Sequence, residues 1–151
     1  MLDYQHSLIH NSILYYQKNE DIHKTAREIF RMAFDKGWDK EYGGLLYFFD
    51  CLGNPPEAYE HDMKLWWPQN EAIIANKMAY EIFKEEKYKQ AYESILEYTL
   101  DKFADKENGE WYGYLNYDST VSSSLKGNLF KGPFHIPRMF MILNEYQNGN
   151  I

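Results

Sequence analysis

The chain has 151 residues, a formal net charge of −7 and a pI near 5.2. This length fits a single domain, covering residues 1–151, that buries a real hydrophobic core, and the acidic balance excludes the basic face that a nucleic-acid-binding protein needs. Aromatic residues make up 18% of the chain, which suits either a site that stacks on sugar rings or a core built from large side chains.

Two helices are predicted at the start of the chain. The first covers residues 5–17, where His6 and His10 share a face at a spacing that can chelate a metal. No acidic residue joins them at a suitable spacing, so no metal site is expected. An apolar stripe of period 3.6 predicts the second helix, from an N-cap at residues 19–21 to Gly37, which is expected to take the left-handed C-cap conformation.

A long loop with a small hairpin is predicted at residues 38–50, because turn residues precede a short β-prone run there. The single cysteine, Cys51, follows in a turn and excludes an internal disulfide, which fits a reducing compartment. Residues 1–10 lack a signal-peptide pattern, and no apolar run reaches transmembrane length. We therefore expect a cytoplasmic protein that does not bind membranes.

Three further helices complete the prediction. The third begins at Trp66, with Pro68 suited to the first helical position. The fourth covers residues 87–103, and the short connector before it makes helices three and four antiparallel neighbours. The last begins near Pro137 and ends at Asn148-Gly149-Asn150.

The loops that follow helices two and four resemble each other. The sequence DKEYGGLLYFFD at residues 39–50 is similar to DKENGEWYGYLNYD at residues 105–118, and Pro68 then corresponds to Pro137, about 69 residues later. Such a repeat predicts an all-α fold, a partial (α/α)6 toroid of antiparallel helical hairpins with long loops and small β-hairpins on one rim. About five helices cannot close a ring of six hairpins. We expect a homodimer, or an association with the missing N-terminal hairpins, to cover the open flanks.

Two helix entrances, residues 64–71 and 131–138, share a pattern of aromatic residues, a proline and a charged side chain. We expect them to face one pocket. Trp67 would offer a ring face to a sugar, and Glu71 would offer a hydrogen-bonding carboxylate. Trp66 is expected in the core, because adjacent residues at a helix entrance point in different directions.

Four blocks, in this order and at these separations, resemble the N-acylglucosamine 2-epimerase family. They are residues 43–45 (GGL), 63–72 (MKLWWPQNEA), 109–116 (GEWYGYLN), and 125–127 (LKG) with 131–138 (KGPFHIPR). The resemblance covers nearly everything from residue 37 to residue 143. Members are (α/α)6 barrels, and the chain looks like about their C-terminal third to two-fifths.

The resemblance implies a sugar 2-epimerase that interconverts N-acylglucosamine and N-acylmannosamine by proton transfer at C2, without a cofactor. His135 would be the acid/base, Glu71 would orient a hydroxyl or a histidine, and Arg138 would bind hydroxyls or the developing oxyanion. Three further residues are candidates for contact with the sugar: Trp67, Trp111 and Lys64. The alternatives are that Trp111 only stabilises its loop and that Lys64 is a solvated surface residue.

The second histidine of the family lies in a His-x-x-Glu arrangement at the start of a helix. His6 is the nearest candidate in this chain, but Ile9 occupies the glutamate position. Whether the chain alone is an enzyme therefore stays open. The alternatives are a catalytically incomplete helical module that binds sugars or another protein, and a mannose isomerase or cellobiose 2-epimerase activity that uses the same bases.

Overall fold

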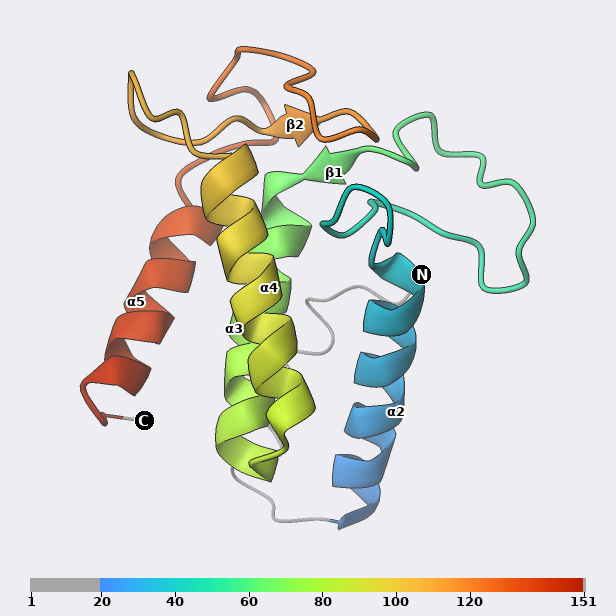
Figure 1. Ribbon diagram of the computed structural model, residues 1–151, viewed down its shortest axis with the longest axis vertical. Coiled ribbons are helices and arrows are strands. Elements are labelled where there is room, and N and C mark those ends of the chain that lie inside the picture. Colours follow the sequence, from blue (N-terminus) through green and yellow to red (C-terminus); the bar gives the residue numbers. More distant parts are fainter. Residues whose placement is uncertain (1–19, 151) are drawn as a thin grey trace.

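The computed structural model describes residues 20–150 (Figure 1). Within them, four helices and two short strands form in the order α2 (Glu20–Gly37), β1 (Lys64–Leu65), α3 (Trp66–Phe83), α4 (Glu86–Lys102), β2 (Tyr114–Leu115) and α5 (His135–Gln147). The helix predicted at residues 5–17, which includes His6 and His10, lies outside the described residues. None of the helices described is long and apolar enough to span a bilayer.

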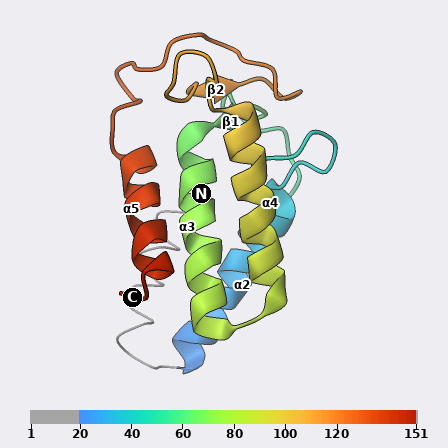
Figure 2. The ribbon, with the colours of Figure 1, turned by 60° about the vertical axis from the view of Figure 1, so that its left-hand side comes forward.

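Successive helices run in opposite directions, with the long loops at one end of the molecule and the short α3–α4 connector at the other (Figure 1). Helix α3 lies between α4 and α5 and packs against both (Figure 2). The predicted arrangement of antiparallel hairpins with their loops on one rim is confirmed.

Helix α3 is the centre of the core. Residues 72–75 have no exposed surface, and they lie in a helix that carries apolar residues on several faces. Helix α2 is amphipathic by contrast and buries one face, where Phe30 packs edge to face on Tyr88 of α4 with ring centroids 5.4 Å apart. The rigid position of α3 fixes the side chains at its N-terminal end, on the rim.

The internal repeat is visible in the two rim hairpins. A single antiparallel bridge closes each of the loops 38–45 and 104–111. In each loop the carboxylate of the second residue, Asp39 or Asp105, accepts a hydrogen bond from the backbone N–H two residues later, at 2.9 and 3.0 Å. The two sequences therefore form the same turn, as their similarity predicted.

Three local predictions need correction. Gly37 is not left-handed; it is the buried last residue of α2, and a Cβ there would make an ordinary contact with Leu45 at 3.4 Å. Pro68 and Pro137 occupy the third helical position and not the first. A proline is tolerated there because the first four N–H groups of a helix have no intrahelical partner.

One element was not predicted at all. Strands β1 and β2 pair antiparallel, with Lys64 opposite Leu115 and Leu65 opposite Tyr114. The pairing joins the loop before α3 to the loop after α4. It also places the start of α3 beside the second rim loop, where the backbone N–H of Trp66 donates to the carbonyl of Gly113 at 3.0 Å.

Candidate active site

The two helix entrances meet at a buried carboxylate. Glu71 lies one turn into α3 and is 1% exposed. His135 and Arg138, one turn apart at the start of α5, both reach it: His135 Nδ1 lies 2.8 Å from Glu71 Oε1, and Arg138 Nη1 donates to Oε1 and Oε2 at 2.7 and 2.6 Å. The structure thus brings together three residues predicted from separate blocks of the sequence.

This contact determines what the imidazole can do. A buried carboxylate is stable as an anion only with a compensating charge and hydrogen bonds, which Arg138 and His135 supply to Glu71. An acceptor at Oε1 selects the tautomer of His135 with its proton on Nδ1 and a lone pair on Nε2. Within residues 20–150, no side chain or backbone group hydrogen bonds to this Nε2. His135 is therefore arranged to accept a proton from a bound molecule.

A pocket of about 400 Å³ opens beside His135. Most of its wall is aromatic, and the lining residues are Tyr47, Phe48, Glu60, Leu65, Trp66, Trp67, Tyr114, Phe130 and His135. The rings of Trp67 and His135 lie 5.8 Å apart at an angle of 33°, so together they form a tilted, nearly continuous face. Such a face suits the apolar side of a sugar ring.

Trp66 is 2% exposed and belongs to the core, as predicted. It nevertheless contributes to the pocket wall next to Trp67, so the assumption that adjacent residues cannot both reach one pocket was wrong. The first turn of α3 lies under the rim loops, and large rings at both positions extend to the same hollow.

Six pocket residues were missed in the sequence, and two of them, Leu65 and Tyr114, lie in β1 and β2. Tyr47, Phe48 and Glu60 lie in the loop between α2 and β1, and Phe130 lies in the loop before α5. These loops carry no hydrophobic period that would indicate which side chains turn inward. Proximity in sequence to the two helix entrances was the only available signal, and it does not distinguish Phe48 from its neighbour Phe49.

Two predicted sugar contacts do not line the pocket. Trp111 is 6% exposed and packs edge to face on Phe140 of α5 at 6.0 Å, so it stabilises its loop. Lys64 is fully buried and not solvated. Its ammonium group lies 2.6 Å from Asp39 Oδ2 and also donates to the carbonyl of Tyr117 and to the hydroxyl of Ser119. Lys64 thus connects the rim loops and does not face a ligand.

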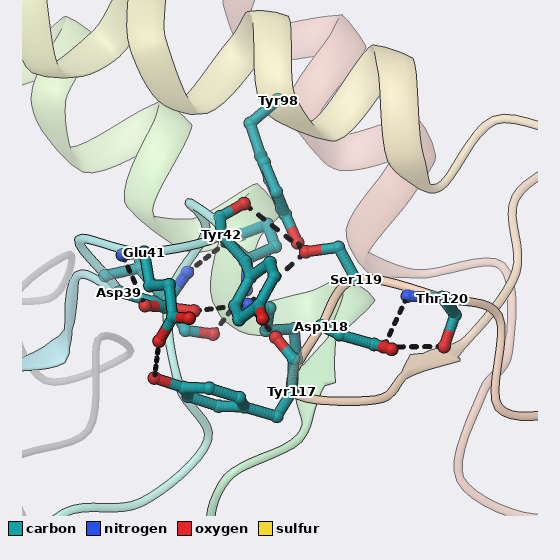
Figure 3. A network of polar contacts seen from close by, with 11 residues as sticks. Asp39, Glu41, Tyr42, Tyr98, Tyr117, Asp118, Ser119 and Thr120 are labelled. Carbon is teal, nitrogen blue, oxygen red and sulfur yellow. Dashed lines mark hydrogen bonds and ion pairs between the residues drawn. The ribbon is translucent and has the colours of Figure 1, made fainter.

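Asp39, the partner of Lys64, belongs to the network of polar contacts that Figure 3 shows. Burial would raise the pKa of Asp39, but the hydrogen bond from Lys64 and those from the backbone outweigh it and hold the pKa below its ordinary value. Tyr98 reaches the same network from α4 and shares a 2.8 Å hydrogen bond with Ser119. Burial raises the pKa of Tyr98 to about 12, so it stays a neutral phenol.

In the part of the chain that the structure describes, no three His, Cys, Asp or Glu side chains lie close enough together to hold a metal ion. His6 and His10 lie outside that part, so their roles stay predictions.

Comparison with known proteins gives the family from sequence and the fold from structure. The family model for N-acylglucosamine 2-epimerase matches residues 7–133. The N-acylglucosamine 2-epimerase of Bos taurus is 44% identical over 118 residues, which are 78% of this chain and 28% of that protein. The chain therefore spans little more than a quarter of the length of this relative.

Solved structures show the fold. A D-mannose isomerase superposes with a TM-score of 0.80 at 22% identity, over 91% of this chain and 36% of that one. A cellobiose 2-epimerase from Spirochaeta thermophila gives 0.78 at 14% identity, over 93% and 36%. Both are (α/α)6 toroids, so the predicted partial toroid is confirmed. Because the family model matches most of the chain and the Bos taurus relative is 44% identical, the chain belongs to the N-acylglucosamine 2-epimerase family.

Proposed function

We propose that this chain forms the C-terminal part of an (α/α)6 sugar 2-epimerase that interconverts N-acylglucosamine and N-acylmannosamine. The observation that carries the proposal is His135, which lines an aromatic pocket and has Nδ1 on the buried carboxylate of Glu71, while no hydrogen bond from residues 20–150 occupies Nε2. This is the arrangement of a general base held in one tautomer by a carboxylate.

The reaction needs a proton removed from C2 of the open-chain sugar, beside the C1 aldehyde. The C2–H bond breaks, and its electron pair forms a C1–C2 double bond while the π pair of the C1 carbonyl moves to its oxygen, which gives an enolate. The proton passes to Nε2 of His135. Glu71 then stabilises the imidazolium. Arg138 balances the charge of Glu71 and keeps further N–H donors, which can bind the enolate oxygen on C1.

Epimerisation also requires that the proton return to the opposite face of C2. A second base on that side is the simple solution, and His6 is the candidate in this chain. His6 lies outside the described residues, so its place opposite His135 is part of the proposal. Whether the chain alone turns over sugar depends on this second base.

The N-acylhexosamine substrate is favoured by the relative in Bos taurus, which shares 44% identity with this chain. The two solved structures, a D-mannose isomerase and a cellobiose 2-epimerase, share the fold at 22% and 14% identity. Mannose isomerase or cellobiose 2-epimerase activity is therefore the second choice. A non-catalytic sugar-binding module, or one that binds another protein, is the third.

The test is loss of the C2 proton signal of N-acetylmannosamine in heavy water, followed by proton NMR. It uses the 151-residue chain and a chimera in which this chain replaces the matching 118-residue segment of the Bos taurus protein. We expect the chimera to exchange the proton, and His135→Asn to slow exchange by about 10²–10⁴-fold. His61→Asn is the matched control, since the side chain of His61 does not line the pocket.

Substrate and catalytic role are judged separately. Exchange with mannose or cellobiose but not with N-acetylmannosamine would replace the proposed substrate. If a folded chimera exchanges the C2 proton of none of these sugars, the non-catalytic module becomes the remaining alternative. Equal rates for His135→Asn and His61→Asn would refute the role of His135.

The location and assembly of the protein are also proposals. One cysteine, exposed and unpaired, supports a cytoplasmic location. A homodimer, or association with further hairpins that complete the ring, is supported by the large apolar side chains that α5 exposes, such as Met141 at 68%. Light scattering on the purified chain and on the chimera tests both forms of assembly.

A further inference from the structure

The loop before α5 carries one pocket residue, Phe130, and leads directly into His135. It is fastened to the second rim hairpin through Lys131. The side chain of Lys131 is 3% exposed, and its ammonium group donates to both carboxylate oxygens of Glu110 at 2.8 and 2.7 Å and to the carbonyl of Lys126 at 2.7 Å. A buried lysine with three such contacts holds its loop in one position.

Glu110 holds this contact from a strained backbone. Its φ of 62° lies in the left-handed region that a residue with a Cβ disfavours. The equivalent position of the first rim hairpin, one residue before the closing bridge partner, is Gly44, with a φ of 79°. Glycine would remove the strain from the second hairpin too. The ion pair with Lys131 is the feature of Glu110 that glycine cannot supply.

The stem of Lys131 also packs against the backbone of the second rim loop. A Cβ added to Gly113 would lie 2.9 Å from Lys131 Cδ, so the stem covers this glycine closely. The ammonium group lies 6.0 Å from the ring centroid of Trp66, which lines the pocket. Lys131 therefore lies next to the pocket residue Trp66 and ties the loop that carries Phe130 to the second rim hairpin.

We propose that Glu110 and Lys131 are positioning residues that hold Phe130 and His135 in their places at the pocket. The inference rests on the proposed function, because position matters for catalysis. A base displaced by about 1 Å from the proton that it removes loses about 10²-fold in rate. Glu110 lies in the second rim hairpin, and Lys131 lies in the loop before α5. The ion pair therefore ties this loop to a separate segment of the chain.

The decisive variant is Glu110→Gly, which removes the ion pair and relieves the backbone strain together. Lys84→Gly is the matched control: Lys84 is also left-handed, with a φ of 54°, and caps α3 at the end far from the rim. We expect Lys84→Gly to keep the thermal stability of the parent protein, and Glu110→Gly to lower it, because Lys131 stays buried without its carboxylate. Only Glu110→Gly should raise hydrogen–deuterium exchange in residues 125–135, measured by mass spectrometry.

Lys131→Met gives a second, independent measure, because it leaves the backbone at position 110 unchanged. It should raise exchange in the same segment, and Lys131→Arg should restore most of the protection. In the chimera, Glu110→Gly and Lys131→Met should lower the kcat for C2 proton exchange by about ten- to a hundred-fold. The pH profile should stay unchanged, because the base itself is intact.

The outcomes separate the two proposals. Unchanged exchange in residues 125–135 for Lys131→Met overturns the inference, even if Glu110→Gly loosens the loop through its glycine alone. Unaltered kcat in both variants overturns it as well. A parent chimera without turnover refutes the proposed function, while the hydrogen–deuterium measurement still decides whether the clamp exists.

Discussion

Replacing Lys64 by methionine should destabilise the protein strongly, although lysine substitutions are usually mild. Lys64 has no exposed side-chain surface, and its partner Asp39 is only 3% exposed. Methionine keeps most of the apolar stem, so the change leaves little cavity and mainly removes the charge. The carboxylate of Asp39 would then stay buried without its cation.

The magnitude follows from this burial. Removing one partner of a buried ion pair costs about 3–5 kcal/mol, because the remaining charge is neither solvated nor compensated. For a chain of this size, each kcal/mol lowers Tm by about 2–4 °C, so we expect a fall of roughly 6–20 °C. An exposed pair behaves differently. Lys89→Met, which breaks a surface contact of 3.5 Å with Glu86, should cost about 0–1 kcal/mol.

Urea unfolding followed by far-UV circular dichroism at pH 7 measures both variants. The double variant Asp39→Asn/Lys64→Met completes the cycle. It should lose less free energy of unfolding than the sum of the single variants, because neither charge is then left alone. A loss below about 1 kcal/mol for Lys64→Met, equal to that for Lys89→Met, would refute the claim that a buried charge pair holds the rim loops together.

Three further predictions concern the rim and the core. Because the pKa of Asp39 is lower in the folded protein, its ionised carboxylate stabilises the fold above the ordinary pKa of 3.8, and this stabilisation is lost as the pH falls through the folded pKa. The difference in urea midpoint between the parent protein and Asp39→Asn should therefore close below pH 3.8. A difference that widens there would contradict a lowered pKa. Gly44→Ala should cost about 2–5 kcal/mol, because φ is +79° and the new Cβ would lie 2.4 Å from the ring of Tyr98. Gly53→Ala, at a φ of +84° with open space around the new Cβ, should cost only about 1–2 kcal/mol. Equal shifts in Tm for the two variants would exclude the clash with Tyr98. Ile73→Ala, at a fully buried position of α3, should lower the free energy of unfolding by about 2–5 kcal/mol in the same urea assay, and a loss under 1 kcal/mol would show that α3 is not the core.

The helices could be predicted because each carries its own local signal. The stripe that includes Phe30 located α2, and Trp66 was correctly identified as the start of α3. The pairing of β1 with β2 had no such signal. A strand of two residues is too short for an alternating pattern, and its partner lies beyond two helices.

The site was predictable to the extent that a motif specified it. His135, Glu71 and Arg138 stand in blocks that resemble the family, and the structure brings them into contact. The burial of Lys64 and Lys131 was not predictable, because lysine is normally exposed and only a distant acidic partner makes burial tolerable. For Lys64, residue type alone therefore favoured a solvated surface position, which is wrong.

The β1–β2 pairing has a consequence for the order of folding. Helices α3 and α4 are joined by a short connector and can form a hairpin from neighbouring segments. The two strands flank this hairpin and can meet only after it has brought their ends together (Figure 1). The rim loops are therefore the last part to assemble in refolding. The fluorescence of Trp38 and Trp111, which close these loops, should change after helical ellipticity has returned.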